Sequence, residues 1–183
     1  IGGNSNEDDI EQAIRYLEKA LEYEPEYIEA IIKLANWHGW MYFLGLDRTD
    51  LRLAENRKYL DMAKSIAPDE PLVFQAEGTY YYRMFRDYDK AFELFDKANL
   101  KTADSYAFRA WVLRRLGRWD ECIEYILKSI ELNPKAAGIY RELGGTYNAI
   151  GDYDKALEAL NTAIGLVPND YETYLNKANW LYL

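Results

Sequence analysis

Two residue types that often carry out nucleophilic or acid–base chemistry occur only once each in this chain, as His38 and Cys122. A single histidine excludes a multi-histidine metal site, and any histidine-based triad would have to use His38. The sequence contains none of the common phosphate-binding, zinc-peptidase, nucleophile-elbow or calcium-loop motifs. We therefore predict no catalytic residues, no metal site and no cofactor. Turnover that depends on His38 or Cys122 would be needed to support an enzyme.

An acidic cluster near the start of the chain has two interpretations. Glu7, Asp8 and Asp9 could attract a cation, but the ordered spacing of a calcium loop is absent. Carboxylates at a helix N-terminus also stabilise the free backbone N–H groups and complement the helix dipole. We interpret the cluster as the beginning of a helix.

Composition restricts the classes of partner. The chain has 183 residues, of which 49% are hydrophobic, and its net charge of −9 disfavours nucleic acid and anionic membranes. We expect protein or peptide partners instead. A single cysteine excludes an intrachain disulfide, and no apolar run is long enough to span a bilayer. With no glycosylation sequon, these features predict a cytoplasmic protein.

The elements that must position any functional residue follow an internal repeat. Residues 114–134 and 148–168 match each other at a spacing of 34 residues, so that Gly117 aligns with Gly151. A fixed period in this range is typical of stacked helical units. Each unit needs the next one to bury its apolar face.

One unit, residues 137–168, shows how the repeat is built. Apolar and small residues recur at helical spacing on both sides of Gly151, which predicts two amphipathic helices. Gly151 is placed to end the first helix, Asp152 to cap the second and Pro168 to stop it.

The pattern of this unit resembles the tetratricopeptide repeat, whose first helix carries an aromatic residue, Leu-Gly and Tyr, and whose second carries Ala, an apolar residue, Ala and Pro. The matching residues are Tyr140, Leu143, Gly144, Tyr147, Ala156, Leu160, Ala163 and Pro168. Residues 103–134 fit as well, although Arg109 replaces the usual Leu and Ser129 the usual Ala. The resemblance implies an all-α fold, an α-solenoid of antiparallel helix pairs with about ten helices.

Carried along the chain, the resemblance predicts the organisation of the domain. We interpret residues 1–8 as a flexible N-terminal linker or an expression scar, and residues 9–183 as a single array. The array comprises a half repeat over 9–25, repeats over 26–68, 69–102, 103–134 and 135–168, and a half repeat over 169–183. The repeat over 26–68 carries an insertion of nine residues, LDRTDLRLA, and Asn56 takes the place of a small residue.

The half repeats at both ends suggest open surfaces. We expect either a fragment of a longer protein or an end, carrying Trp180, Leu181 and Leu183, that a second copy covers. A homodimer through the open solenoid ends is therefore a further hypothesis. Residues 43–98 are also similar to repeat segments that follow output domains of bacterial signalling proteins. A regulatory or sensory segment of a nucleotide cyclase or transcription regulator thus stays open as the alternative function.

The resemblance further implies a concave groove, lined by the first helix of each pair, in which the family holds segments of partner proteins. The groove positions transferred to this sequence are Asn36, Trp40, Tyr82, Arg83, Trp111, Arg114, Arg115, Arg141, Asn148 and Asn179. Four arginines among them could bind carboxylates in bidentate fashion, and the aromatic residues offer apolar anchors. The predicted function is a non-catalytic interaction scaffold, and the predicted ligand is an acidic or C-terminal peptide segment with a bulky apolar side chain.

Two considerations restrict this prediction. The arginines could instead be a solvated face paired with glutamates of adjacent helices. In addition, the carboxylate clamp of chaperone-binding family members is incomplete, because Ile32, Ala76, Asp104 and Phe108 occupy related positions. We therefore do not predict an adaptor for chaperone tails.

Overall fold

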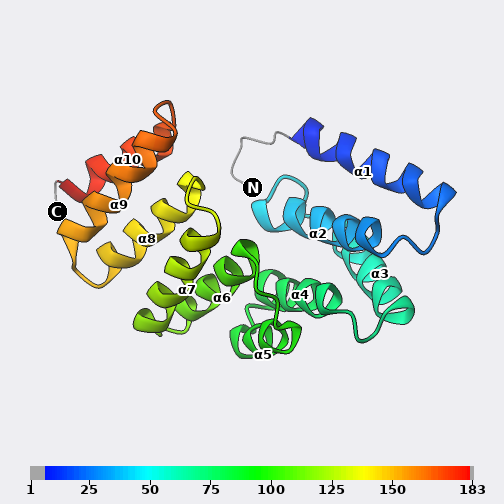
Figure 1. Ribbon diagram of the computed structural model, residues 1–183. Helices are drawn as coiled ribbons and strands as arrows, with labels where there is room; N and C mark the ends of the chain where they lie inside the picture. Colours follow the sequence, from blue (N-terminus) through cyan, green and yellow to red (C-terminus); the bar gives the residue numbers. More distant parts are fainter. Residues whose placement is uncertain (1–6, 182–183) are drawn as a thin grey trace. The chain divides into compact units, whose positions relative to one another are not determined.

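A computed structural model describes residues 7–181, in which every long regular element is an α-helix (Figure 1). The helices are α1 (Glu7–Tyr23), α2 (Ile28–Leu44), α3 (Asp50–Ile66), α4 (Pro71–Tyr80), α5 (Tyr88–Ala98), α6 (Ala103–Arg115), α7 (Trp119–Leu132), α8 (Ala137–Ala149), α9 (Tyr153–Leu166) and α10 (Tyr171–Leu181). A π-helix, η1 (Tyr81–Phe85), continues α4. The predicted all-α class and the expected number of helices are confirmed.

Some predictions concern residues outside this range. Residues 1–6 of the predicted linker and Leu183 at the predicted open end are not among the described residues, and neither are the side chains of Trp180 and Leu181. Helix α1 begins at Glu7, two residues before the predicted start of the first half repeat. Its first turn is acidic, as expected for side chains that complement the helix dipole.

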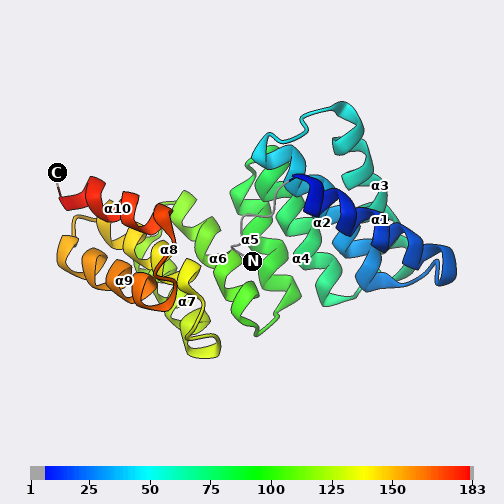
Figure 2. The ribbon, with the colours of Figure 1, turned by 90° about the horizontal axis from the view of Figure 1, so that it is seen from above.

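The chain divides into two compact units between Leu100 and Lys101. In unit 1, α2 packs on α3 and α4 on α5, while α1 packs against α2 (Figures 1 and 2). In unit 2, α6 packs on α7 and α8 on α9, while α10 packs against α9. The core of unit 1 includes Ile10 and Ile14 of α1 together with Ile31 and Leu34 of α2. The helices thus pair as predicted, whereas the repeat boundaries and the single array over 9–183 stay predictions.

Backbone conformation at the helix ends explains the start and stop signals. Gly151 has a φ of 82°, a left-handed conformation that is easily adopted only by glycine. The side chain of Asp152 then accepts a hydrogen bond from the backbone N–H of Lys155 at the start of α9. Helix α5 ends at Ala98 without a proline after it, and the next residue, Asn99, has a left-handed φ of 46°. Asparagine tolerates this conformation better than most residues.

Arg109 of α6 and Ser129 of α7, the two residues that depart from the repeat pattern, both form hydrogen bonds. Arg109 is only 3% exposed, and its Nη1 donates to Ser105 Oγ at 2.6 Å. Ser129 is buried, and its Oγ donates to the backbone oxygen of Ala103 at 2.9 Å. Arg109 Nη1 and Ser129 Oγ are therefore both hydrogen-bonded, as buried polar atoms normally are.

The predicted insertion lengthens two helices rather than forming a separate segment between them. Helices α2 and α3 each have 17 residues, whereas α6 and α7 have 13 and 14. Helix α3 already begins at Asp50, because the Thr49 side chain caps it by accepting from Arg52 N. Asn56 of α3 donates to the oxygen of Ala35, and a Cβ on Gly39 would lie 2.8 Å from its Nδ2. Gly39 is therefore the small residue that accommodates Asn56.

Candidate functional site

The predicted groove residues of unit 1 lie on α2 and η1, which contact each other. Asn36 and Trp40 belong to α2, while Tyr82 and Arg83 belong to η1. The guanidinium carbon of Arg83 lies 4.5 Å from the centroid of the Trp40 ring and 5.9 Å from that of Phe43. The structure therefore brings Trp40 and Arg83 together as a cation–π pair.

The charge of Arg83 is not neutralised within its own unit. No salt bridge joins its guanidinium to a carboxylate of the described part of unit 1. Burial lowers the pKa of Arg83 to about 10, so the group is still protonated at neutral pH. A partly buried cation on an aromatic surface, without an anionic partner, is suited to bind a carboxylate.

The other two predicted residues of unit 1 contribute differently. The ring of Tyr82 packs against that of Tyr88, with centroids 5.6 Å apart, and is partly buried. Asn36, one turn before Trp40 on α2, is also partly buried.

In unit 2, two of the predicted arginines form ion pairs between successive first helices. Arg114 of α6 pairs with Glu142 of α8 at 2.5 Å. Arg141 of α8 pairs with both Asp170 and Glu172, each at 2.8 Å, at the beginning of α10. The pairs with Glu142 and Glu172 match the alternative in which the arginines pair with glutamates of adjacent helices, whereas Asp170 precedes α10.

The remaining predicted residues of unit 2 are either exposed or half-buried. Arg115 on α6 and Asn179 on α10 are exposed. Trp111 Nε1 and Asn148 Oδ1 are buried atoms that have no hydrogen-bond partner among the described residues. Buried polar atoms are normally paired, so these two atoms are exceptions within the described structure.

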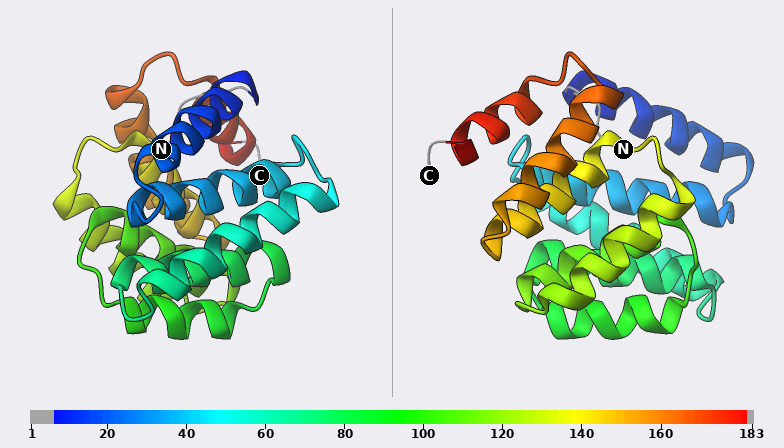
Figure 3. Two further views of the ribbon diagram at one scale, coloured as in Figure 1. Left: turned by 90° about the vertical axis from the view of Figure 1, so that its right-hand side faces the viewer. Right: turned by 60° about the vertical axis from the view of Figure 1, so that its left-hand side comes forward.

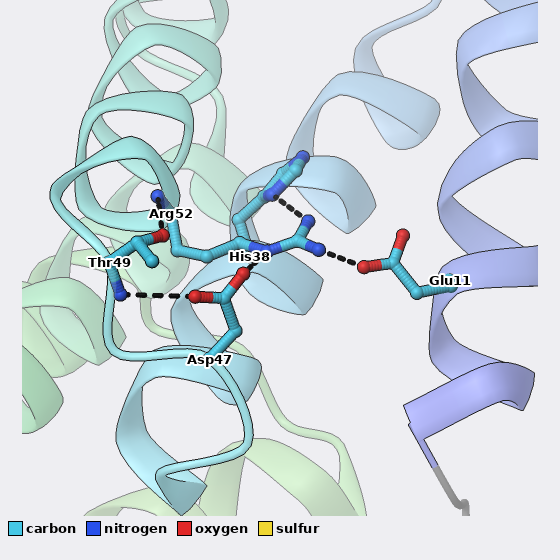
Figure 4. Close-up of polar contacts among 5 residues, drawn as sticks. All are labelled: Glu11, His38, Asp47, Thr49 and Arg52. Carbon is cyan, nitrogen blue, oxygen red and sulfur yellow. Dashed lines mark hydrogen bonds and ion pairs between the residues drawn. The ribbon is translucent and has the colours of Figure 1, made fainter.

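A polar cluster in unit 1 was not predicted from the sequence (Figure 4). Arg52 of α3 donates from Nε to Asp47 Oδ2 at 2.8 Å, from Nη1 to His38 Nδ1 at 3.1 Å, and from Nη2 to Glu11 of α1. Its side chain is only 14% exposed. One guanidinium thus joins three helices and the loop between α2 and α3.

His38 has a structural role in this cluster. Because arginine can only donate, His38 Nδ1 accepts, and the neutral ring carries its proton on Nε2. Nε2 is buried without a partner in the described structure, and burial lowers the pKa of His38. The ring stacks on Tyr59 with centroids 5.7 Å apart. These contacts favour the packing interpretation of His38.

Cys122 lies in the core of unit 2. It is 1% exposed, its Sγ lies 3.8 Å from Thr146 Oγ1, and burial raises the pKa of its thiol. A raised pKa makes the nucleophilic thiolate scarce at neutral pH, which favours an inert structural cysteine.

The loop beside Arg52 is fixed by short-range hydrogen bonds. Asp47 Oδ1 accepts from the backbone N–H of Thr49 at 3.1 Å, and Thr49 Oγ1 accepts from that of Arg52 at 3.4 Å. The sequence signal for this arrangement is Asp47 followed by Thr49 just before a helix, a typical capping pattern.

Residues 7–181 contain no cluster of three or more histidine, cysteine, aspartate or glutamate side chains arranged to hold a metal ion. None of the helices in the same range is both long and apolar enough to cross a membrane.

Comparison with known families identifies the repeat. Family models described as tetratricopeptide repeat match residues 101–169 and residues 4–27. These matches cover the helices of unit 2 that carry Arg114 and Arg141, and all of α1. Both models describe a repeat rather than an enzyme.

Individual relatives extend over more of the chain. The human cell division cycle protein 16 homolog is 25% identical over 158 residues, which cover 79% of this chain and 25% of that protein. The Hsp70-Hsp90 organizing protein of Triticum aestivum is 26% identical over 176 residues, covering 93% of this chain and 29% of that protein. The chain therefore spans less than a third of the length of either relative.

A solved structure shows the same fold. A thermophilic tetratricopeptide repeat protein of Thermus thermophilus superposes with a TM-score of 0.78 at 20% identity. The match covers 96% of this chain and 92% of that structure.

Proposed function

Because the chain belongs to the tetratricopeptide repeat family, we propose that it is a non-catalytic scaffold that binds a segment of a partner protein along its first helices. The wheat relative is named for organising two other proteins, Hsp70 and Hsp90. That name supports a role in protein interaction for this chain as well. The proposed binding face of unit 1 is formed by α2 and η1.

The observation that carries the proposal is the environment of Arg83. Its guanidinium lies on Trp40 and near Phe43, and no carboxylate of the described part of unit 1 pairs with it. A carboxylate of the partner would form a charge-assisted hydrogen bond there. An apolar side chain beside that carboxylate would pack on the indole ring. The proposed ligand is therefore an acidic segment with a large apolar residue.

The residues of unit 2 have other roles in this proposal. Arg114 and Arg141 already bind Glu142 and Asp170, so we assign them to holding the first helices in register. A ligand that displaced the ion pairs would first have to break them, at a cost in binding free energy.

The experiment is affinity capture from a lysate of the source organism with the intact chain and two charge-reversed variants. Arg83→Glu removes the proposed cation, while Arg57→Glu is the matched control on α3, where Arg57 pairs with Asp61 in an exposed position. Circular dichroism must first show equal helicity for all three proteins. We expect a partner that wild type and Arg57→Glu retain and Arg83→Glu loses. Identical partners for all three proteins would contradict the proposed face.

A further inference from the structure

We propose that a proton controls the docking of helix α1 on unit 1, because protonation of His38 displaces Arg52, the residue that holds Glu11 of α1. These three residues are here called the α1 switch. The inference goes beyond the proposed function, since the switch needs no ligand and does not involve Trp40 or Arg83. Three observations support it: the small buried surface of α1, the shared guanidinium of Arg52 and the protonation state of the His38 ring.

Helix α1 is the element of unit 1 that can leave most easily. In the left view of Figure 3, α1 (dark blue) lies against α2 at the edge of unit 1, on the side away from α4 and α5 (green). Of its 17 residues, two have buried side chains, Ile10 and Ile14. An element with few buried apolar contacts opens at a lower free energy than the core around it. Release of α1 therefore does not require the rest of unit 1 to unfold.

One guanidinium makes both polar contacts of the α1 switch. Arg52 of α3 donates from Nη2 to Glu11 of α1 and from Nη1 to His38 Nδ1 of α2, at 3.1 Å for the second contact (Figure 4). The side chain of Arg52 is 14% exposed, so solvent and salt screen its ion pair with Glu11 less than they screen a surface pair. A guanidinium is planar and rigid, so its donors move together. Loss of the contact with His38 therefore disturbs the ion pair with α1.

The His38 ring has a single nitrogen that can take up a proton. Because Nδ1 accepts from Arg52, the neutral ring already carries its hydrogen on Nε2. The added proton must therefore go to Nδ1, whose lone pair is occupied by the Arg52 hydrogen bond. Protonation would place two positively charged N–H donors against each other at this position. Arg52 then has to move away, and its Nη2 leaves Glu11.

The other charges around His38 favour its protonated form once Arg52 has moved. They come from three directions: Glu18 on α1, Asp47 in the connection between α2 and α3, and Glu55 and Lys58 on α3. The three carboxylates stabilise a positive ring, whereas Lys58 opposes it. Arg52 opposes it as well, and it is the cation in direct contact with the ring. The arrangement without the Arg52 contact therefore binds the proton more readily than the docked one.

The pH range of the α1 switch follows from the same contacts. In the docked state burial lowers the pKa of His38, an effect that the carboxylate of Glu55 partly opposes. In the released state the ring gains access to water, and its pKa returns toward the ordinary value of about 6.5. Docking of α1 is therefore complete above about pH 7.5 and weakens as the pH falls through 6.5. For one proton, the docking constant decreases by up to about tenfold between pH 7.5 and 5.5.

Release of α1 changes the surface that unit 1 presents. Ile31 and Leu34 of α2 belong to the same apolar core as Ile10 and Ile14 of α1. When α1 leaves, part of this core becomes accessible to solvent. His38 is the only histidine of the chain, and histidine is the only side chain whose ordinary pKa lies between pH 5 and 8. A pH-dependent change at α1 in this range can thus be assigned to one residue.

The test is hydrogen–deuterium exchange of the intact chain at pH 7.5 and 5.5, with peptides of α1 and α3 analysed by mass spectrometry. Protection factors are corrected for the pH dependence of intrinsic exchange. His38→Gln keeps an acceptor for Arg52 but cannot take up the proton. Glu11→Gln removes the ion pair and leaves His38 in place. The control is Glu22→Gln, which makes the same charge change at an exposed position of the same helix.

In wild type and Glu22→Gln, we expect the protection of α1 to fall about three- to tenfold at pH 5.5, to at least about tenfold below that of α3. His38→Gln should show equal α1 protection at both pH values. Glu11→Gln should show weaker α1 protection at pH 7.5 and little further loss.

Three results would overturn the proposal. The first is α1 protection that does not change with pH in wild type. The second is equal protection of α1 and α3, which would mean that unit 1 opens as a whole. The third is a wild-type pH response in His38→Gln or Glu11→Gln. Trp40 and Arg83 are unchanged in every variant, so such a failure leaves the proposed binding face untouched.

Discussion

Arg52 and Glu11 form an ion pair that joins helix α3 to helix α1 across 41 positions of the sequence. Helix α1 has no paired helix of its own among the described residues of unit 1, and it packs through Ile10 and Ile14. The ion pair adds a directional polar contact to the apolar packing of Ile10 and Ile14. It fixes α1 relative to the hairpin formed by α2 and α3.

Replacing Arg52 by alanine should destabilise unit 1 by about 1–3 kcal/mol, because Asp47, Glu11 and His38 all lose their shared donor. We expect α1 to become the first segment cut by a protease. Denaturation followed by circular dichroism, together with limited proteolysis, measures both effects.

The matched control is Arg57→Ala, since Arg57 and Asp61 are both about half exposed and lie on one helix. The guanidinium of Arg57 also lies 5.6 Å from the centroid of the Tyr80 ring, so the loss should be below about 1 kcal/mol. Equal stability losses for Arg52→Ala and Arg57→Ala would show that the Arg52 cluster has no special role.

Stability should fall as the pH decreases from 7.5 to 5.5, and His38 should be one cause. Burial lowers the pKa of His38 below its usual 6.5, an effect that the nearby carboxylate of Glu55 partly opposes. Below pH 6.5 the unfolded chain therefore binds a proton that the folded chain does not. The contribution of His38 to the free energy of unfolding is therefore complete above pH 7.5. As the pH falls, the free energy of unfolding decreases by at most about 1.4 kcal/mol per pH unit for one proton.

The control for this pH dependence is His38→Gln, whose amide oxygen can still accept from Arg52. The slope between pH 7.5 and 5.5 should be shallower in this variant, as measured by urea denaturation. An unchanged slope would assign the effect to other groups.

Two glycines should respond in opposite ways to alanine. A Cβ on Gly78 of α4 would lie 2.6 Å from Cε1 of Phe95 and 3.1 Å from the backbone oxygen of Ala91. Gly78→Ala should therefore cost about 1–3 kcal/mol. Gly165 of α9 has open space at the same position. Gly165→Ala should stabilise the protein by about 0.5–1 kcal/mol. Thermal denaturation of both variants measures these effects. A shift of the melting temperature in the same direction for both would contradict the prediction.

Cys122 should resist alkylation in the folded protein. The side chain is 1% exposed and burial raises the pKa of its thiol, so iodoacetamide should react more than about a hundredfold more slowly than in urea. A suitable comparison is Leu132→Cys in a Cys122→Ala background, because position 132 is exposed. If the two thiols reacted at similar rates in the folded proteins, unit 2 would have to open around Cys122.

The helix pairs were predictable because their signals are local. Gly151 and Asp152 determine where one helix ends and the next begins, and the spacing of apolar residues determines which face is buried. The π-helix η1 was not predictable in this way, because Tyr81–Phe85 reads as a continuation of α4. Arg83 lies within this π-helix, and residue types do not specify such a change in backbone hydrogen bonding.

The candidate site was predictable only in part, since it depends on contacts between distant residues. Trp40 and Arg83 were both named from the repeat positions, and the structure pairs them. Pairing of the groove arginines with glutamates of adjacent helices was left as an alternative and is seen between Arg141 and Glu172, whereas the ion pair between Arg52 and Glu11 was missed. Ion pairs between helices follow from packing geometry, whereas a single sequence records only that opposite charges exist. The hypothesis of a regulatory segment in a larger bacterial signalling protein stays a prediction.

The length of the α2–α3 hairpin has an evolutionary consequence. Helices in a stack pack through the part of each pair that faces its neighbours, so residues added at the connected end do not shift that register. Evolution can therefore lengthen one hairpin and select new chemistry at its end, while the neighbouring pairs keep their sequences. A protein engineer could use the same position to graft a loop, provided that Arg52 and Asp47 are retained to hold its base.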